Sequence, residues 1–139
     1  MSADIRWKQR FDNFSRAYIL LSTAFEGRNI EDFDELQKEG LIQRFQYTFE
    51  LTWKTLKDYL EYETVPIDVI SPRNVIKEAA DSNLLELMGV DGEILFDMLQ
   101  TRNLLSHTYD FTFFESALEK IENNYLSEIA GIYAFLKEK

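Results

Sequence analysis

The stretch that decides the fold is residues 42–60, which read IQRFQYTFELTWKTLKDYL. Its large apolar side chains recur every three or four residues, and they are Ile42, Phe45, Phe49, Trp53, Leu56 and Leu60. This spacing places them on one face of an α-helix, which has 3.6 residues per turn. The pattern predicts an amphipathic helix that begins near Asn29 or Asp32 and ends near Tyr62, with Gly40 as a candidate interruption.

Four other segments show the same apolar periodicity. The first runs from about residue 4 to residue 25. The third begins at Ser71-Pro72, where serine can cap a helix and proline suits its first position, and it ends at Gly89. The fourth is capped by Asp91 and runs through Arg102, and the fifth opens at residues 112–115, TFFE, which have capping-box spacing.

The apolar faces of these segments are the predicted core. The first and third segments contribute Trp7, Phe11, Phe14, Tyr18, Leu21, Phe25, Val75, Ile76, Ala79, Ala80, Leu84 and Leu87. The fourth and fifth contribute Ile94, Leu95, Met98, Leu99, Phe114, Leu118, Ile121, Tyr125, Ile129, Ile132 and Leu136. Short connections between amphipathic helices predict an all-α fold, an antiparallel, up-and-down bundle of about five helices. We expect residues 1–139 to form a single domain.

Composition excludes several classes of protein. The net charge of −10 argues against a broad electrostatic grip on DNA or other nucleic acid, and it suits a basic partner protein. The chain has no cysteine, no apolar run long enough for a membrane span, and no signal-peptide pattern at its N-terminus. We therefore expect a cytoplasmic protein that does not associate with membranes.

Metal and cofactor chemistry finds no support in the sequence. A single histidine excludes histidine-rich zinc sites, and the di-iron bundle pattern fails because residue 104 is leucine where that pattern requires glutamate. No glycine-rich phosphate loop is present. We expect neither a bound metal nor a cofactor.

The most unusual stretch is residues 101–109, TRNLLSHTY. Arg102 shares a predicted helical face with the apolar Leu95, Met98 and Leu105. A guanidinium stays charged and is costly to bury alone, so Arg102 must meet an acid, carbonyl groups, a second subunit or an anionic ligand. An internal acid such as Glu50 is one candidate, although Glu50 has the spacing for a solvated pair with Lys54.

The only histidine, His107, follows five residues after Arg102. On an unbroken helix the two side chains would point roughly 140° apart. They can form one site only if the helix ends near Ser106 or if two copies of the motif face each other across a symmetric dimer. A structural interpretation is also open, in which His107 interacts with a helix C-terminus and Arg102 with an internal acid.

The pattern Arg102-Asn103-x-x-x-His107-x-Tyr109 resembles the signature of HEPN domains, specifically the HepT-like branch long labelled nucleotidyltransferase substrate-binding proteins. The resemblance covers most of the chain. Residues 40–57, Ser71-Pro72-Arg73 and residues 97–102 are also similar to blocks of that family, and they occur in the same order.

The resemblance implies a homodimer joined through the helices that bear the motif, paired with a small nucleotidyltransferase as its antitoxin. The family member is typically a metal-independent ribonuclease toxin. Arg102 would then bind the scissile phosphate, His107 would act as general base or acid, and Asn103 would orient the phosphate or the partner motif. The nucleotidyltransferase would silence the toxin by adding AMP to Tyr109.

Two other functions remain open at this point. The chain can be a non-catalytic subunit that binds a substrate or nucleotide in the dimer cleft for the nucleotidyltransferase, which its acidity favours. It can also be a purely structural interaction module. The intact set of Arg102, Asn103, His107 and Tyr109 favours the ribonuclease by a modest margin.

Overall fold

The computed structural model describes residues 2–108 and 110–139, and every regular element in them is helical. Its α-helices are α1 (Ala3–Ala24), α2 (Glu35–Tyr62), α3 (Pro72–Asp81), α4 (Leu84–Met88), α5 (Gly92–Leu105), α6 (Phe111–Lys120) and α7 (Leu126–Lys137). A 3-10 turn, η1 (Ile30–Asp32), precedes α2, and a π-helical segment, η2 (Ile121–Tyr125), joins α6 to α7. The predicted all-α bundle is confirmed.

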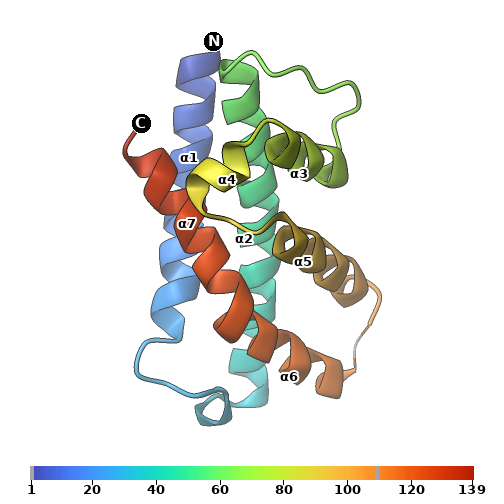
Figure 1. Cartoon of the computed structure of the whole chain (residues 1–139). Coiled ribbons are helices and arrows are strands. Elements are labelled where there is room, and N and C mark those ends of the chain that lie inside the picture. The colour runs from blue at the N-terminus through green and yellow to red at the C-terminus, as the bar shows by residue number, and fades with distance from the viewer. Residues whose placement is uncertain (1, 109) are drawn as a thin grey trace.

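The long antiparallel pair α1 and α2 forms the back of the molecule (Figure 1). Asp34 caps α2 by accepting a hydrogen bond from the backbone N–H of Gln37, whose side chain accepts one in return from the Asp34 N–H. The helix therefore begins later than predicted. Gly40 does not interrupt α2, which stays helical through the whole stretch.

The predicted third helix is divided in two. Asn83 adopts a left-handed conformation (φ 66°), which separates α3 from α4. The break changes the rotational register of the following turn, so Leu84 and Leu85 are buried while Leu87 is 71% exposed. The prediction that Leu87 belongs to the core is wrong for this reason. The prediction for Ala80 is also wrong, because Ala80 lies on the exposed side of the last turn of α3, before the break. The predicted end at Gly89 is confirmed, with glycine in the left-handed conformation (φ 70°).

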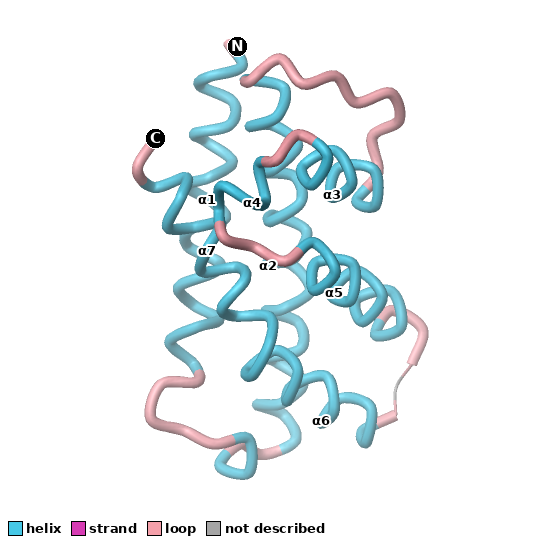
Figure 2. Tube along the Cα trace, viewed as in Figure 1, coloured by secondary structure: helices cyan, strands magenta, loops and turns pink. Residues whose placement is uncertain are grey.

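The C-terminal arm runs from α6 through η2 into α7 without a loop (Figure 2). Its cap is Asp110, whose carboxylate accepts a hydrogen bond from the backbone N–H of Thr112, so the predicted capping box at Thr112 is wrong. The predicted apolar stripe from Phe114 to Leu136 is buried at every position. Through this stripe, α7 packs on α1 and α6 packs on α2. Helix α5 also packs on α2, so α5 and α6 both lie against the front of that helix.

The core is rich in aromatic side chains, as predicted. Trp7, Phe14, Phe45, Phe49 and Tyr125 are all at most 2% exposed. Within the described ranges, no helix combines the length and the apolar character that a membrane span requires.

Candidate functional site

Helix α5 carries Arg102 and Asn103, two of the residues that the sequence singles out. It begins at the predicted cap, where the Asp91 carboxylate accepts a hydrogen bond from the Glu93 N–H. Leu95, Met98 and Leu105 of its apolar face are buried. Arg102 lies in the last turn of α5 and is only partly exposed. It therefore lies at the edge of the apolar face, as predicted.

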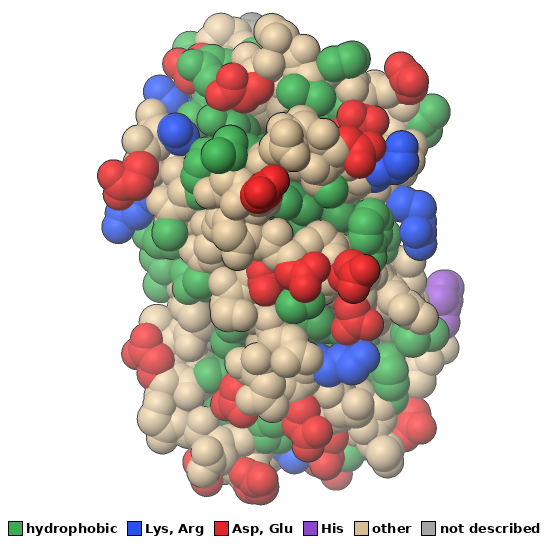
Figure 3. Space-filling view, viewed as in Figure 1, with side chains coloured by type: hydrophobic (Ala, Val, Ile, Leu, Met, Phe, Trp, Pro, Cys, Tyr) green, Lys and Arg blue, Asp and Glu red, His purple; other side chains and the backbone are tan. Residues whose placement is uncertain are grey.

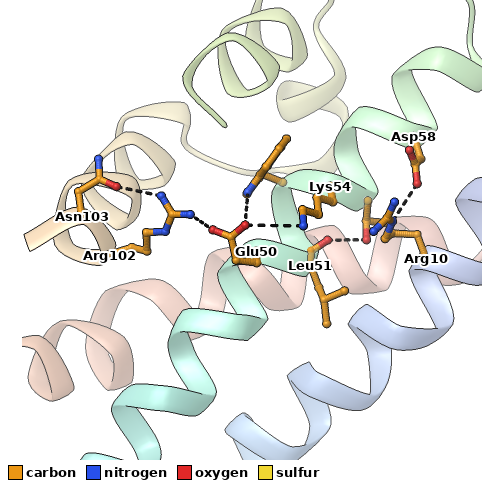
Figure 4. A network of polar contacts seen from close by, with 9 residues as sticks. Arg10, Glu50, Leu51, Lys54, Asp58, Arg102 and Asn103 are labelled. Carbon is orange, nitrogen blue, oxygen red and sulfur yellow. Dashed lines mark hydrogen bonds and ion pairs between the residues drawn. The ribbon is translucent and has the colours of Figure 1, made fainter. Parts of the chain in front are cut away.

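Arg102 is held by two side chains (Figure 4). Its Nη2 donates to Glu50 Oε1 on α2, and its Nη1 donates to the Asn103 side-chain oxygen at 2.9 Å. Arg102 and Glu50 are 28% and 29% exposed, so this ion pair is shielded from water on most sides. Of the partners left open for Arg102 by the sequence, the structure thus shows the internal acid Glu50.

Glu50 is itself fixed from a second direction. Its Oε2 accepts a hydrogen bond from the indole N–H of Trp53 at 3.1 Å, and Lys54 Nζ lies 4.0 Å from the same oxygen. The carboxylate therefore bridges α2 and α5 in a defined orientation. The negative charge of Glu50 compensates the positive charge of the Arg102 guanidinium. A second anion at this position would have to bind Arg102 together with Glu50 or displace the Glu50 carboxylate from it.

His107 lies just beyond α5. The helix ends at Leu105, Ser106 caps it, and the His107 backbone N–H donates to the Leu104 carbonyl at 3.1 Å. The imidazole is exposed, and it is the purple side chain in Figure 3. Within residues 2–108 and 110–139, no hydrogen bond or ion pair joins it to Arg102. The helix does end near Ser106, which was one of the two conditions for a single site. Within one protomer, however, no direct contact joins the described side chains of Arg102 and His107.

Asn103 is also exposed, and its side chain contacts Arg102 from the neighbouring position in the helix. Tyr109, the predicted AMP acceptor, lies outside the described residues.

A second polar cluster, which sequence reasoning missed, lies beside this site. The Tyr125 hydroxyl donates to the Asp97 carboxylate and lies 2.8 Å from the Thr101 hydroxyl, while Lys120 Nζ lies 3.5 Å from the same Asp97 oxygen. Burial, and then the hydrogen bond to Asp97, raise the pKa of Tyr125 far above its ordinary value. Tyr125 thus stays protonated and ties η2 to α5 one residue before Arg102.

The sequence contains only a weak indication of this polar cluster. Tyr125 falls in the apolar stripe of the C-terminal segment, which predicts a core residue without indicating a partner for its hydroxyl. The π-helical turn that ends at Tyr125 was not predictable from periodicity, although such turns frequently occur at functional sites.

Comparison with known proteins gives the family. Residues 9–138 match the family described as nucleotidyltransferase substrate binding protein like. The chain belongs to this family. Its structure is also similar to a crystal structure of a protein from Thermus thermophilus, with a TM-score of 0.73 and 26% identity over 88% of this chain and 98% of that chain. No curated protein matches it.

The family description associates this substrate-binding-like chain with a nucleotidyltransferase. Acidic side chains outnumber basic ones on the face shown in Figure 3, in keeping with the net charge of −10. Arg102 and Lys54 are two cations that both lie beside the Glu50 carboxylate. Across the part of the chain that the structure describes, no three histidine or acidic side chains are placed to hold a metal ion.

Proposed function

We propose that this chain is the ribonuclease subunit of a HEPN/nucleotidyltransferase toxin–antitoxin pair, acting in the cytoplasm as a homodimer of HepT-like domains. The observation that carries the proposal is the Arg102 guanidinium, oriented by Glu50 and Asn103 in the last turn of α5, immediately before the exposed His107. The family description supports the nucleotidyltransferase partner.

In this proposal the reaction is a metal-independent transesterification of RNA. The neutral His107 imidazole takes the proton of a ribose 2′-hydroxyl, whose oxygen attacks the adjacent phosphorus. The bond from phosphorus to the 5′-oxygen breaks, which leaves a 2′,3′-cyclic phosphate. The 5′-oxygen takes a proton from solvent water, and the protonated His107 returns its proton to solvent. Arg102 stabilises the charge that develops on the phosphate, and Asn103 orients it. DNA lacks the 2′-hydroxyl and is not a substrate.

In the proposed homodimer, Arg102 of one protomer and His107 of its partner form one site. Arg102 and His107 are not hydrogen bonded to each other in the protomer, and the helix that presents Arg102 ends before His107. Two copies of the end of α5, facing each other across a two-fold axis, place the histidine of one protomer against the arginine of the other. The exposed Leu104 (46%) and Tyr47 (40%) are available as apolar contacts for such an interface.

Silencing completes the proposed function. The Tyr109 oxygen attacks the α-phosphorus of ATP, pyrophosphate leaves, and the phenol proton passes to solvent. The resulting AMP group carries a negative charge two residues from His107, where it competes with RNA for the site.

The test is RNA cleavage by the purified protein in EDTA. Wild type is compared with His107→Ala, Arg102→Ala and the control Arg16→Ala, which removes an arginine that is 73% exposed and forms an ion pair with Asp12 on the same helix, α1. We expect cleavage by wild type and the control, and a loss of at least about 100-fold in the other two. Cleavage by His107→Ala at the wild-type rate would contradict the mechanism.

A second arm of the experiment tests silencing. The protein is incubated with the nucleotidyltransferase and ATP, and mass spectrometry locates the added AMP. We expect one AMP on Tyr109, none in Tyr109→Phe, and loss of cleavage in step with modification. Modification at another residue would contradict the assignment.

A non-catalytic substrate-binding subunit is the second candidate function. It is favoured by the family description and by the Arg102–Glu50 pair, which compensates the cation before any phosphate arrives. This alternative predicts that a nucleotide binds the dimer and that no RNA is cleaved under any condition of the first assay.

A further inference from the structure

A cavity of about 320 Å³ lies beside the candidate site, between α2, the end of α5 and the start of α6. Its lining combines polar and apolar groups, and the residues are Glu39, Ile42, Gln43, Gln46, Leu105, Ser106 and Phe114. The cleavage mechanism proposed above uses none of these side chains.

The polar groups of the cavity are available to a ligand. Among the described residues, the side chains of Glu39, Gln43 and Gln46 make no hydrogen bond or ion pair within the protein. Gln46 is half-buried, and the other two are exposed. Two amides offer both donors and acceptors, whereas the carboxylate can only accept.

The apolar walls are firmly placed. Ile42, Leu105 and Phe114 are 4%, 6% and 8% exposed, so each presents only a small surface to the cavity. Helix α6 is tied to α2 nearby, because Lys38 Nζ lies 3.4 Å from Glu115 Oε1 and 5.5 Å from the centre of the Phe111 ring. The cavity is therefore formed before a ligand arrives.

The position of the cavity relates it to the Arg102–Glu50 pair. Gln46 is one helical turn before Glu50 on α2, and Ser106 caps α5 four residues after Arg102, with its hydroxyl donating to the Arg102 carbonyl at 3.1 Å. The near end of the cavity is therefore about 6 Å of helix axis from Glu50, whereas Glu39, at its far end, is eleven residues and about 16 Å from Glu50. An extended nucleotide spans the cavity when its phosphate lies against Arg102 and its base edge against Glu39.

The geometry points to a nucleobase subsite in this cavity, which accepts guanine from the nucleotide whose phosphate meets Arg102. Unstacked RNA bases are recognised through hydrogen bonds to their edges and through packing of their faces. Guanine places two adjacent N–H donors, N1–H and the N2 amino group, beside the O6 acceptor. A Glu39 carboxylate matches the two donors, and a glutamine amide N–H matches O6. No other common base offers two adjacent donors to one carboxylate.

This inference rests on the proposed function for the phosphate at Arg102, and binding of mononucleotides tests the base subsite directly. The probes are guanosine, adenosine, cytidine and uridine 5′-monophosphates, titrated by calorimetry into the full chain. Variants are Glu39→Gln, Gln43→Met and Gln46→Met. The matched control is Gln100→Met, which changes an exposed glutamine of α5 that does not line the cavity.

We expect guanosine monophosphate to bind about tenfold more tightly than the other three nucleotides. Each cavity variant reduces that preference several-fold, while the control retains it. Circular dichroism verifies that every variant keeps its helical content. Equal affinity for all four nucleotides, or an unchanged preference in all three cavity variants, overturns the subsite.

The outcome separates this inference from the function on which it builds. If no RNA is cleaved but guanosine monophosphate binds and its preference depends on Glu39, the base subsite stands and the ribonuclease proposal fails. If RNA is cleaved and the cleavage sites of wild type and Gln46→Met coincide without a bias for guanine, the subsite fails and the ribonuclease stands.

Discussion

Replacing Glu50 by glutamine tests the contact on which the site is built. The substitution keeps the shape of the side chain and an oxygen that can accept the Trp53 indole hydrogen bond. It replaces Oε1, which accepts from Arg102, by an amide NH2, so the pair loses both its charge and a hydrogen-bond acceptor. Because the volume of the side chain is conserved, a loss of stability reports on the polar contacts of Glu50, chiefly the one with Arg102, and not on lost packing.

The size of the effect follows from the exposure of the pair. Breaking a fully buried ion pair costs about 3–5 kcal/mol, whereas exposed pairs contribute about 0–1 kcal/mol. Arg102 and Glu50 are 28% and 29% exposed, so solvent screens part of the attraction. We expect Glu50→Gln to lower the free energy of unfolding by about 1–2 kcal/mol. In a double-mutant cycle with Arg102→Gln, we expect a coupling of about 1 kcal/mol.

The assay is urea denaturation at one fixed protein concentration, because dimerisation would make stability depend on concentration. Lys54→Met is the control. Lys54 Nζ is 4.0 Å from the same carboxylate and its side chain is 41% exposed, so its loss should change the free energy by less than about 0.5 kcal/mol. A coupling between Glu50 and Arg102 within the scatter of independent sites, about 0.3–0.5 kcal/mol, would refute the reasoning.

Three further predictions concern the scaffold. Tyr125→Phe leaves the Thr101 hydroxyl, which is 3% exposed, without its partner, and should cost about 1–2 kcal/mol in urea unfolding; an unchanged midpoint would contradict the described network. The pKa values of Tyr59 and Tyr125 are both raised above 10.0, first by burial and then by hydrogen bonds to carboxylates. Their contribution to stability is therefore complete below pH 10.0 and is lost as the pH rises above it, because the unfolded chain releases these protons while the folded protein retains them. The difference between the unfolding midpoints at about pH 8 and pH 11 measures this loss of stability. The difference should be smaller in Tyr125→Phe than in wild type, and a difference of the same size would contradict the assignment to Tyr125. Gly89→Ala should destabilise the protein by about 1 kcal/mol, because φ at Gly89 is +70°. Gly40→Ala, inside α2 with open space around the new methyl group, should stabilise it by about 0.5–1 kcal/mol. Thermal unfolding measures both variants, and shifts of the same sign would contradict this prediction.

Local periodicity and capping chemistry were sufficient to predict most of the helices. The stripe from Phe114 to Leu136 is buried throughout, and the ends at Ser71-Pro72, Gly89 and Asp91 lie where the residue types indicate. These features depend on neighbours within one or two turns. Prediction failed where one residue changed the backbone locally, as at Asn83, or where two capping residues competed, as at Asp110 and Thr112.

The sequence by itself determined that Arg102 needs a polar or anionic partner, because a guanidinium at the edge of an apolar face is costly to bury alone. Only the tertiary structure decided which of the 25 acidic residues this is, since Glu50 lies 52 positions away on another helix. The Asp97–Tyr125–Thr101 cluster and the cavity beside Gln46 likewise depend on how α5, α6 and η2 pack on α2. Periodicity determines which face of a helix is buried, but contacts between distant segments depend on the packing of those faces, which a single sequence does not encode in any local pattern.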